Sequence, residues 1–579
     1  MPSNADRRLL QIIRAAELII DAFDDYNARF SDITRRAARH FARRDWQGQQ
    51  RSARERIGLY DVCIAETIGR LEHCLQERLL VKAIWLDIRK HYSERIDQAI
   101  DAELYKTFFN TLTRRLFKTR GVQARIEFVA LDIEPTEQIT HPIDRHIYSC
   151  RDNVMSAMQR MLSNLELGLD TRSLVNDAAA VADRLQRDMR AIDSAGLLSI
   201  ELLKVVFYRD RRAYLIGRAF GQDRWLACAL ALVHADDGVR VEAVLTERQQ
   251  ISILFGFTYS YFQADLATIA DAIVFLRTLL PNKPIDELYT VLGRVKQGKT
   301  ERYRHLFKHL TQAESEQLIE AEGQRGMVML VFTLPSYPLV FKLVRDHFAP
   351  GKKLGREHVL NQYRLVFNHD RVGRLIDAQE YRHLSFERRL FSDQLLRLLQ
   401  EECGRIVRID DERVIIAHCF VQRRVRPLDL YLDEVSGEQA ERVVIDYGQA
   451  IRDLAHSNLF PGDLFLKNFG VTASLRTVFY DFDEVRRLTD CNFRRIPPAR
   501  SEEQLMSDEI WYTVDAGDAF PEQFQQFMDL SAQHRGVFAE HHSELFDPGW
   551  WQRVKQQLLD NPSRDIRPYP ETALLIRAD

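Results

Sequence analysis

The chain lacks the sequence features of several common protein classes. Its seven cysteines are scattered and include no C-x-x-C pair, which argues against a disulfide framework or a zinc knuckle and favours a reducing compartment. The longest apolar run, WLACALALV from Trp225, is far shorter than the roughly 20 residues that a membrane-spanning helix needs. The sequence therefore predicts a soluble, cytoplasmic protein that does not enter a membrane.

An excess of basic residues is also missing. The net charge is −3 with 28% charged residues, so we expect a surface of mixed charge. The basic stretch RRDWQGQQRSARER, near residue 43, continues into helical periodicity and is interpreted as a solvated helix face. We therefore expect no nucleic-acid partner, and a protein or a small molecule fits the composition better.

The first half of the chain has few glycines and prolines and a helical pattern. Apolar residues recur at helical spacing from residue 8 to about 200 and again from about Tyr261 to Leu318. Between Lys204 and Leu245, short apolar segments alternate with the turn-like RDR, GQD and ADDG, which predicts a small antiparallel meander. This half is predicted to be a mostly helical domain with a β insertion.

A second change in pattern occurs near residue 320. The stretch AEGQRGMVMLVFTLPSYPLVFKLVRD is rich in Val, Phe and Leu and predicts two strands joined by a turn at LPSYP. Helical segments, a strand in RVIIAHCFVQRRV and a helix from about Glu438 to Ala455 follow. Because 579 residues exceed one ordinary domain, we predict an α+β protein with domains at 1–314 and 315–579.

Polar side chains interrupt two apolar stretches of the second half. FPGDLFLKNFG contains Asp463 and, five residues later (468 − 463), Asn468; VFYDFDEV contains Asp481 and Asp483. Each such group must be solvated or paired. Carboxylate and amide oxygens are the ligands that Mg²⁺ takes in phosphoryl transfer, which predicts a phosphoryl-transfer site.

Two upstream features complete this hypothesis. Gly323 and Gly326 precede a strand, where their backbone N–H groups could approach phosphate oxygens. Lys342 stands alone in the apolar LVFKLV, where it needs an anionic partner. Each feature also has an ordinary structural interpretation when it is taken alone. The glycines could form a simple turn and Lys342 could lie on an edge strand. DFDE could be an acidic turn, and GDLFLKN could be a loop that caps a helix. Their common order favours the functional interpretation.

This order resembles the protein-kinase signature set of glycine loop, strand lysine, D-x-x-x-x-N and Asp-Phe. Ala321 replaces the first glycine, Pro461-Gly462 replaces the His-Arg before the catalytic Asp, D-F-D replaces D-F-G, and no A-P-E occurs. Loss of that arginine argues against activation by a phosphorylated loop.

Longer segments narrow the resemblance. With the helical first half and the total length, the stretches DRVGRLIDAQEY, DYGQAI, FPGDLFLKNFGV, YDFDEV and NFRRIPP resemble the bacterial isocitrate dehydrogenase kinase/phosphatase family over the whole chain.

The resemblance implies a helical regulatory domain followed by a bilobal kinase-like domain, and it implies roles for single residues. Lys342 would contact the α- and β-phosphates, Asp463 would orient a serine hydroxyl, and Asn468 and Asp481 would hold Mg²⁺ or Mn²⁺. The nucleotide-phosphate loop would consist of Ala321, Glu322, Gly323, Gln324, Arg325, Gly326 and Met327.

Three further residues are named with different support. Asp377 matches the acid that the family needs for phosphatase activity, and it would help to position a water or the phosphoserine; its local spacing alone would not single it out. Glu357 is a hypothetical ion-pair partner of Lys342. Whether Asp483 is a second metal ligand is left open.

The activity implied is phosphorylation of isocitrate dehydrogenase with MgATP, and removal of that phosphate with a nucleotide such as ADP still bound. No Cys is followed six residues later by Arg and no two-metal His/Asp cluster is evident, so both reactions would share one site. The family also implies AMP as an allosteric effector and control of the glyoxylate bypass, and a homodimer is a further expectation. A small-molecule phosphotransferase and a nucleotide-gated pseudokinase are the alternatives.

Overall fold

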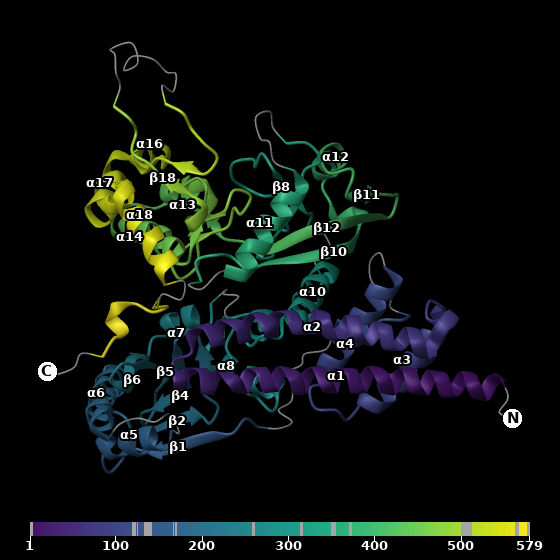
Figure 1. Ribbon diagram of the computed structural model, residues 1–579, viewed down its shortest axis with the longest axis horizontal. Coiled ribbons are helices and arrows are strands. Elements are labelled where there is room, and N and C mark those ends of the chain that lie inside the picture. The colour runs from purple at the N-terminus through teal and green to yellow at the C-terminus, as the bar shows by residue number, and fades with distance from the viewer. Residues whose placement is uncertain are drawn as a thin grey trace. The chain divides into compact units, whose positions relative to one another are not determined.

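The structure is a computed structural model that describes most of the chain (Figure 1). The described residues are 4–118, 123, 125–131, 142–165, 167, 171–256, 261–312, 316–348, 355–369, 373–498, 512–561, 565 and 567–575. Two compact units are present. Unit 1 is formed by Met1–Gly256, Ser260–Glu314 and Tyr569–Asp579, and unit 2 by Phe257–Tyr259 and Ser315–Pro568.

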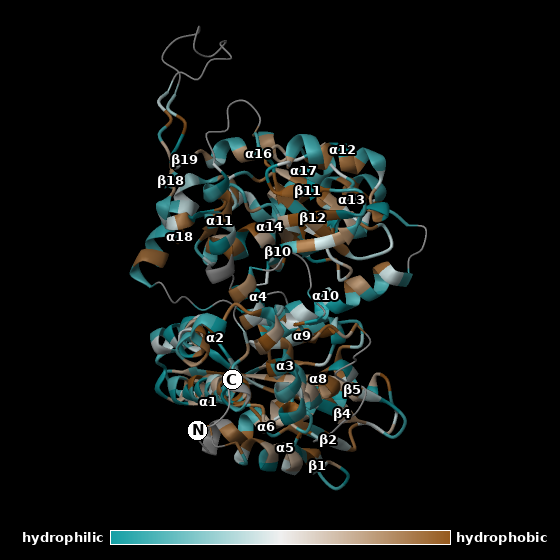
Figure 2. Cartoon of the chain, turned by 90° about the vertical axis from the view of Figure 1, so that its right-hand side faces the viewer, coloured by the Kyte–Doolittle hydropathy of each residue, from teal (hydrophilic) through white to brown (hydrophobic). Residues whose placement is uncertain are grey.

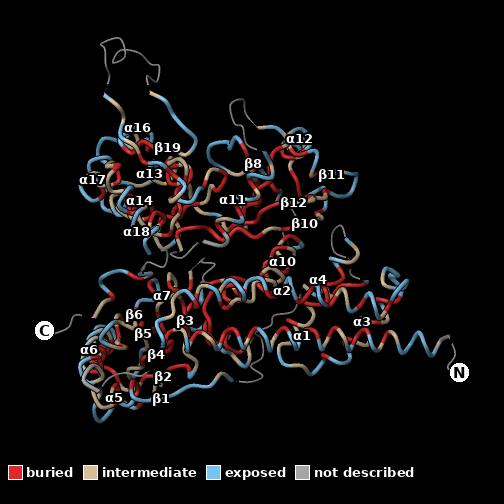
Figure 3. Tube along the Cα trace, viewed as in Figure 1, coloured by how far each residue is buried: buried red, intermediate tan, exposed pale blue. Residues whose placement is uncertain are grey.

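Unit 1 opens with long amphipathic helices, as their periodicity predicts. They are α1 (Asn4–Arg43), α2 (Trp46–Leu75), α3 (Lys82–Ile96) and α4 (Ala102–Phe117). Buried residues recur between exposed ones along α1 (Figure 3), and hydrophobic and hydrophilic residues alternate along the helices (Figure 2). Phe23, Tyr26 and Tyr60 pack around Phe108, with ring centroids 5.4, 6.4 and 5.7 Å away. This aromatic cluster joins α1, α2 and α4.

A six-stranded antiparallel sheet confirms the β insertion and is larger than expected. The order is β1-β2-β4-β5-β6, with β3 paired to β4. The strands are β1 (Arg145–Ser149), β2 (Ser199–Leu203), β3 (Phe207–Arg209), β4 (Arg212–Phe220), β5 (Trp225–Ala235) and β6 (Gly238–Leu245). Strand β1 lies inside the stretch predicted to be helical up to about residue 200, so the prediction was wrong there, and β2 begins where that stretch ends. Between them lie α5 (Val154–Ser163) and α6 (Thr171–Arg190).

The last described residues also belong to unit 1. Arg212 donates from Nε to the Tyr569 hydroxyl at 2.8 Å, that hydroxyl hydrogen-bonds Glu242, and the Leu575 amide donates to the Glu242 carbonyl at 3.0 Å. The predicted second domain ran to residue 579. The described residues 569–575 instead group with unit 1, because these contacts hold them on β4 and β6.

The remaining helices of unit 1 are α7 (Arg248–Leu254), α8 (Ile269–Leu279), α9 (Ile285–Val291) and α10 (Val295–Gln312). Helix α10 carries a buried polar cluster. Glu301 is fully buried, accepts hydrogen bonds from Gln297 at 2.6 Å and Arg304 at 2.9 Å, and shares Arg304 with Glu103. Burial raises the pKa of Glu301 to about 7, although the charge of Arg304 acts in the opposite direction.

Unit 2 begins with an antiparallel sheet in the order β10-β12-β9-β8-β7, with β11 paired to β12. The strands are β7 (Ile319–Glu320), β8 (Met329–Thr333), β9 (Leu339–Val344), β10 (Ala378–Glu387), β11 (Val407–Ile409) and β12 (Arg413–Arg423). Helices α11 (Arg356–His369) and α12 (Asp393–Glu402) lie between the strands in the chain. This sheet contains both strands predicted around the LPSYP turn.

The rest of unit 2 is mainly helical, with α13 (Leu428–Glu434), α14 (Glu438–His456), α16 (Phe524–Phe527), α17 (Ala532–His542) and α18 (Pro548–Asp560). Small sheets are formed by β13 (Arg426–Pro427), β14 (Leu459–Phe460), β15 (Phe469–Val471), β16 (Thr477–Phe479), β17 (Arg486–Arg487), β18 (Asn492–Phe493) and β19 (Asp518–Ala519). The α+β fold class is confirmed. No described helix combines the length and the apolar character that crossing a membrane requires.

The buried cluster on α10 predicts a pH-dependent stability of unit 1. The folded-state pKa of Glu301 lies above its unfolded value, so its contribution to stability is complete below pH 4.5 and is lost as the pH rises through about 7. Glu301→Gln imitates the protonated form. The unfolding free energy of the variant minus that of the unmodified chain should therefore increase by about 1–3 kcal/mol between pH 6 and pH 8.5. Thermal melting of both proteins at the two pH values measures this difference.

Glu72 is exposed on α2 and gives a matched control. The difference between Glu72→Gln and the unmodified chain should not change over that pH range. A Glu301→Gln difference that is equally flat would contradict the assignment.

Candidate active site

The predicted phosphate loop connects β7 to β8. Its first residue is held in the sheet, because the Ala321 amide donates to the Val331 carbonyl at 2.9 Å, whereas residues 322–327 are exposed. Gly323 has a φ of +114°, a conformation that side-chain-bearing residues rarely adopt. The charged side chains of the loop are paired, Glu322 with Arg426 and Arg325 with Glu402. The loop backbone therefore remains accessible.

Lys342 lies in the middle of β9, whose six residues are all buried. Its Nζ atom donates to the carbonyl of Tyr480 at 2.8 Å and lies 4.8 Å from the centroid of the Tyr480 ring. Burial lowers the pKa of Lys342, while the charges of Asp481 and Asp483 act to raise it. The anionic surroundings predicted for this lysine are thus present in the Asp-Phe-Asp segment.

Glu357 is not the ion-pair partner of Lys342. It is exposed in the first turn of α11 and forms no ion pair with Lys342 in the described part of the chain. Helix α11 instead presents Tyr363, whose ring stacks on Phe420 with centroids 3.8 Å apart. Phe420 is the neighbour of Lys342 in the register of β12 and β9.

The structure brings Asp463 and Asn468 together in the segment between β14 and β15. Asn468 is buried and donates from Nδ2 to Oδ1 of Asp463. Its backbone carbonyl accepts from the Tyr480 amide at 3.1 Å. The five-residue spacing therefore closes a loop in which Asn468 is joined to the carboxylate through its side chain and to the residue after β16 through its backbone carbonyl.

The Pro-Gly sequence before Asp463 has a structural reason. Gly462 has a φ of +93°, and a Cβ atom at this position would lie 2.7 Å from both the Cβ atom and the carbonyl oxygen of Glu484. A larger residue, such as the arginine of the kinase signature, does not fit this conformation.

The Asp-Phe-Asp segment follows β16. Phe482 is fully buried and packs edge-on against Tyr363, with centroids 5.2 Å apart. On either side of it, Asp481 is partly exposed and Asp483 is 6% exposed. The buried ring fixes the segment while leaving the Asp481 carboxylate open to a ligand. A metal-binding role of Asp483 stays a prediction.

Asp377 lies beside this segment, although the sequence places them far apart. Leu375 pairs with Phe479 in a parallel bridge, and the Ile376 amide donates to the Phe479 carbonyl at 3.2 Å. Asp377 lies two residues after Leu375, and Asp481 lies two residues after Phe479. Because the bridge is parallel, both aspartates lie on the same side of it. Asp377 is 6% exposed and accepts from Nε2 of Gln379 at 3.0 Å.

Arg374 holds this arrangement, and sequence reasoning missed it. Its buried guanidinium donates to Asp446 at 2.7 and 3.0 Å, to Asp453 at 2.7 Å and to the carbonyl of Thr477 at 2.9 Å. Burial alone would lower the pKa of Arg374, but the two carboxylates outweigh it and raise the pKa above its usual value. Asp446 and Asp453 are seven residues apart (453 − 446) on α14. This spacing places two acids on one helix face and was the available signal.

Comparison with known proteins assigns both halves of the chain. Residues 16–314 match the family model described as the regulatory domain of isocitrate dehydrogenase kinase/phosphatase, and residues 316–571 match the model of its kinase domain. The chain belongs to the isocitrate dehydrogenase kinase/phosphatase family.

Curated relatives agree with this assignment, and each is named isocitrate dehydrogenase kinase/phosphatase. The protein of Xanthomonas euvesicatoria pv. vesicatoria (strain 85-10) is 49% identical over 99% of both chains. That of Anaeromyxobacter sp. (strain Fw109-5) is 38% identical over 97% of both. The resemblance found from the sequence is thereby confirmed.

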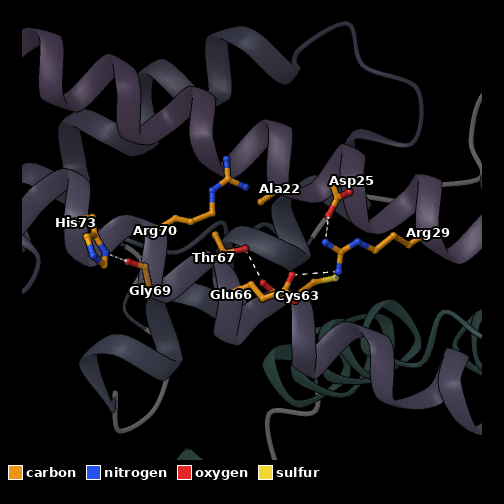
Figure 4. A pocket seen from close by; sticks show the side chains of 9 residues that line it. All are labelled: Ala22, Asp25, Arg29, Cys63, Glu66, Thr67, Gly69, Arg70 and His73. Carbon is orange, nitrogen blue, oxygen red and sulfur yellow. Dashed lines mark hydrogen bonds and ion pairs between the residues drawn. The ribbon is translucent and has the colours of Figure 1, made fainter.

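A second group of potential metal ligands lies in unit 1 and includes none of the kinase-motif residues. The ligand atoms of Asp25, Cys63 and Glu66 are within 4.8 Å of one another and line a cavity of about 570 Å³ (Figure 4). The guanidinium of Arg29 lies among them, 2.8 Å from Asp25, 3.1 Å from Glu66 and 4.0 Å from Cys63 Sγ. The arginine already supplies the cation, so this cluster joins α1 to α2 as an ion pair.

The buried Arg374 network predicts a large effect of one substitution on unit 2. Arg374→Met leaves Asp446 and Asp453 without their cation, which should cost about 3–5 kcal/mol of unfolding free energy. Arg382 pairs with Glu380 but its side chain is 66% exposed, so Arg382→Met should cost less than about 1 kcal/mol. Thermal melting of the two variants measures the difference. Equal melting temperatures would contradict the role of Arg374.

Proposed function

We propose that this chain is a bifunctional enzyme that phosphorylates a serine of isocitrate dehydrogenase with MgATP and removes that phosphate in the same nucleotide site. The observation that carries the proposal is the convergence of Lys342, Asn468 and Asp481 on one residue, Tyr480, in a chain of this family. The relatives' name supplies the protein substrate.

The nucleotide would lie between the loop 321–327 and Lys342. The exposed loop amides would donate to phosphate oxygens, and the Lys342 ammonium would contact the α- and β-phosphates. Lys342 would then exchange its carbonyl partner for a charged one, which compensates its burial better.

The donor atoms around Asn468 fit Mg²⁺ or Mn²⁺. Nδ2 of Asn468 is bound to Asp463, so its Oδ1 atom would be the ligand, and the backbone bond of Asn468 to Tyr480 joins it to the residue before Asp481. Such hard oxygen ligands suit these ions. A bound ion would neutralise charge on the phosphates. Asp463, held by the Asn468 amide, would orient the serine hydroxyl and accept its proton.

Dephosphorylation would use the same site with ADP bound. The cysteine and two-metal phosphatase signatures are missing from the sequence, and Asp377 is fixed beside the strand that leads into Asp481. We assign Asp377 to the phosphatase reaction on this ground. Neither the acid nor its neighbour Gln379 takes part in the hydrogen bonds that link Asp463 to Asn468, so phosphorylation should tolerate its loss.

The regulatory assignments belong to the same proposal. Residues 1–314 would respond to AMP as an allosteric effector, and 315–579 would carry the kinase-like site, with the final segment packed on unit 1 as described. The enzyme would act in the cytoplasm, as a homodimer, and divide carbon between the tricarboxylic acid cycle and the glyoxylate bypass.

The proposal predicts label transfer in both directions. With isocitrate dehydrogenase and labelled MgATP, label should appear on the dehydrogenase, and after ATP is replaced by ADP with AMP it should be released. Incorporation without release would remove the phosphatase half. ATP turnover without incorporation would favour a small-molecule phosphotransferase, and nucleotide binding without any turnover would favour a pseudokinase.

Two aspartate variants should divide the reactions. Asp463→Ala should lower the phosphorylation rate by about 10²–10⁴-fold, because the serine hydroxyl loses its proton acceptor. Asp377→Ala should keep phosphorylation within about twofold and lower label release at least about tenfold. Asp411, fully exposed in unit 2, supplies the control Asp411→Ala. Equal loss of both reactions in both variants would show this division to be wrong.

A further inference from the structure

Tyr480 contacts the kinase-like site through three different parts of the residue. Its amide donates to the Asn468 carbonyl, its carbonyl accepts from Lys342, and its hydroxyl donates to the carbonyl of Lys467. Its ring also lies beneath the Lys342 ammonium. Asp481 is the next residue in the chain. Tyr480 therefore contacts both β9 and the segment of Asp463 and Asn468, and it directly precedes Asp481.

The contact of Tyr480 with Lys342 helps to explain how the buried ammonium group is stabilised. A buried ammonium group requires compensation, and the expected acid, Glu357, is exposed. Beside the charges of Asp481 and Asp483, the carbonyl and the electron-rich face of Tyr480 compensate part of the burial cost. Because neither group of Tyr480 carries a full negative charge, the lysine remains able to move to a phosphate.

The hydroxyl group of Tyr480 contacts a different segment, the one that carries Asp463 and Asn468. Lys467 lies between Asp463 and Asn468 in the chain, so a hydrogen bond to its carbonyl fixes the backbone on which both side chains stand. The ring and the hydroxyl thus have separable tasks.

We infer that Tyr480 is a positioning residue for phosphoryl transfer: its ring and carbonyl set Lys342 for the nucleotide, and its hydroxyl sets the Asp463–Asn468 loop for the reaction. This inference rests on the proposed function. In this inference, Tyr480 places Lys342, a role that was expected of the acidic Glu357 on α11.

Two substitutions separate the two tasks. Tyr480→Phe keeps the ring and the carbonyl and removes only the hydroxyl bond. It should lower kcat for phosphorylation about tenfold with KM for MgATP within about twofold. Tyr480→Leu also removes the ring, and it should in addition raise KM for MgATP about tenfold. The thermal stabilisation by MgADP should fall with Tyr480→Leu and persist with Tyr480→Phe.

Tyr92 provides the matched control. It is a buried tyrosine of unit 1 whose hydroxyl also donates to a backbone carbonyl, that of Tyr105, at 2.8 Å. Tyr92→Phe should lower the melting temperature without changing kcat or KM. Tyr480 variants that behave like Tyr92→Phe, or that leave all kinetic constants within twofold, would overturn the inference.

The proposed function is tested separately in the same assay. Lys342→Met and Asp463→Ala should each lower label transfer at least about 10²-fold, independently of any change at Tyr480. If they do and the Tyr480 variants behave as the unmodified chain, only the positioning role fails. If Lys342→Met and Asp463→Ala leave transfer unchanged, the site assignment itself fails.

Discussion

The buried guanidinium of Arg374 is the constraint on which the geometry of unit 2 depends. It satisfies two carboxylates of α14 and a carbonyl of β16, three groups that would each be costly to bury alone. Such a pair adds little net stability compared with well-packed apolar residues. Its directional bonds instead allow one placement of the segment before β10, because a guanidinium offers its donors in a rigid fork.

From that fixed point, the site is assembled mostly through the backbone. The Phe479 amide donates to the Arg374 carbonyl at 2.7 Å, and the next amide, of Tyr480, donates to Asn468. Lys342 then reaches the carbonyl of Tyr480. Peptide groups have no rotamers, so these links define the spacing of the segments more closely than side-chain contacts would.

The sequence predicted features that depend on local pattern. The strands around the LPSYP turn, the helix of Glu438–His456 and the nearness of Asp463 to Asn468 follow from periodicity and from spacing within one segment. Strand β1 was missed because it is short and lies between helical segments of the chain. Glu357 was proposed without knowledge of which face α11 turns to the sheet. The side that a helix buries is decided by tertiary packing.

Contacts between distant segments were beyond such reasoning. The bridge of Leu375 to Phe479 and the clamp of Arg374 on α14 join residues that no local pattern relates. Asp377 could be named only through resemblance to the family, and its place beside the Asp481 segment became visible through the register. An arginine near two acids spaced by two helical turns is suggestive, but many surface ion pairs share this pattern.

The packing of the last described residues on β6 has a consequence for biosynthesis. Strand β6 ends at Leu245, yet the segment that bridges it at Ala243, through Leu574, emerges from the ribosome only after all of unit 2. Arg212 and Glu242 stay without their tyrosine partner during that interval, and that edge of the sheet stays uncovered. The nascent chain therefore completes the kinase-like unit before it can finish the sheet of the regulatory one, an order opposite to that of their first residues.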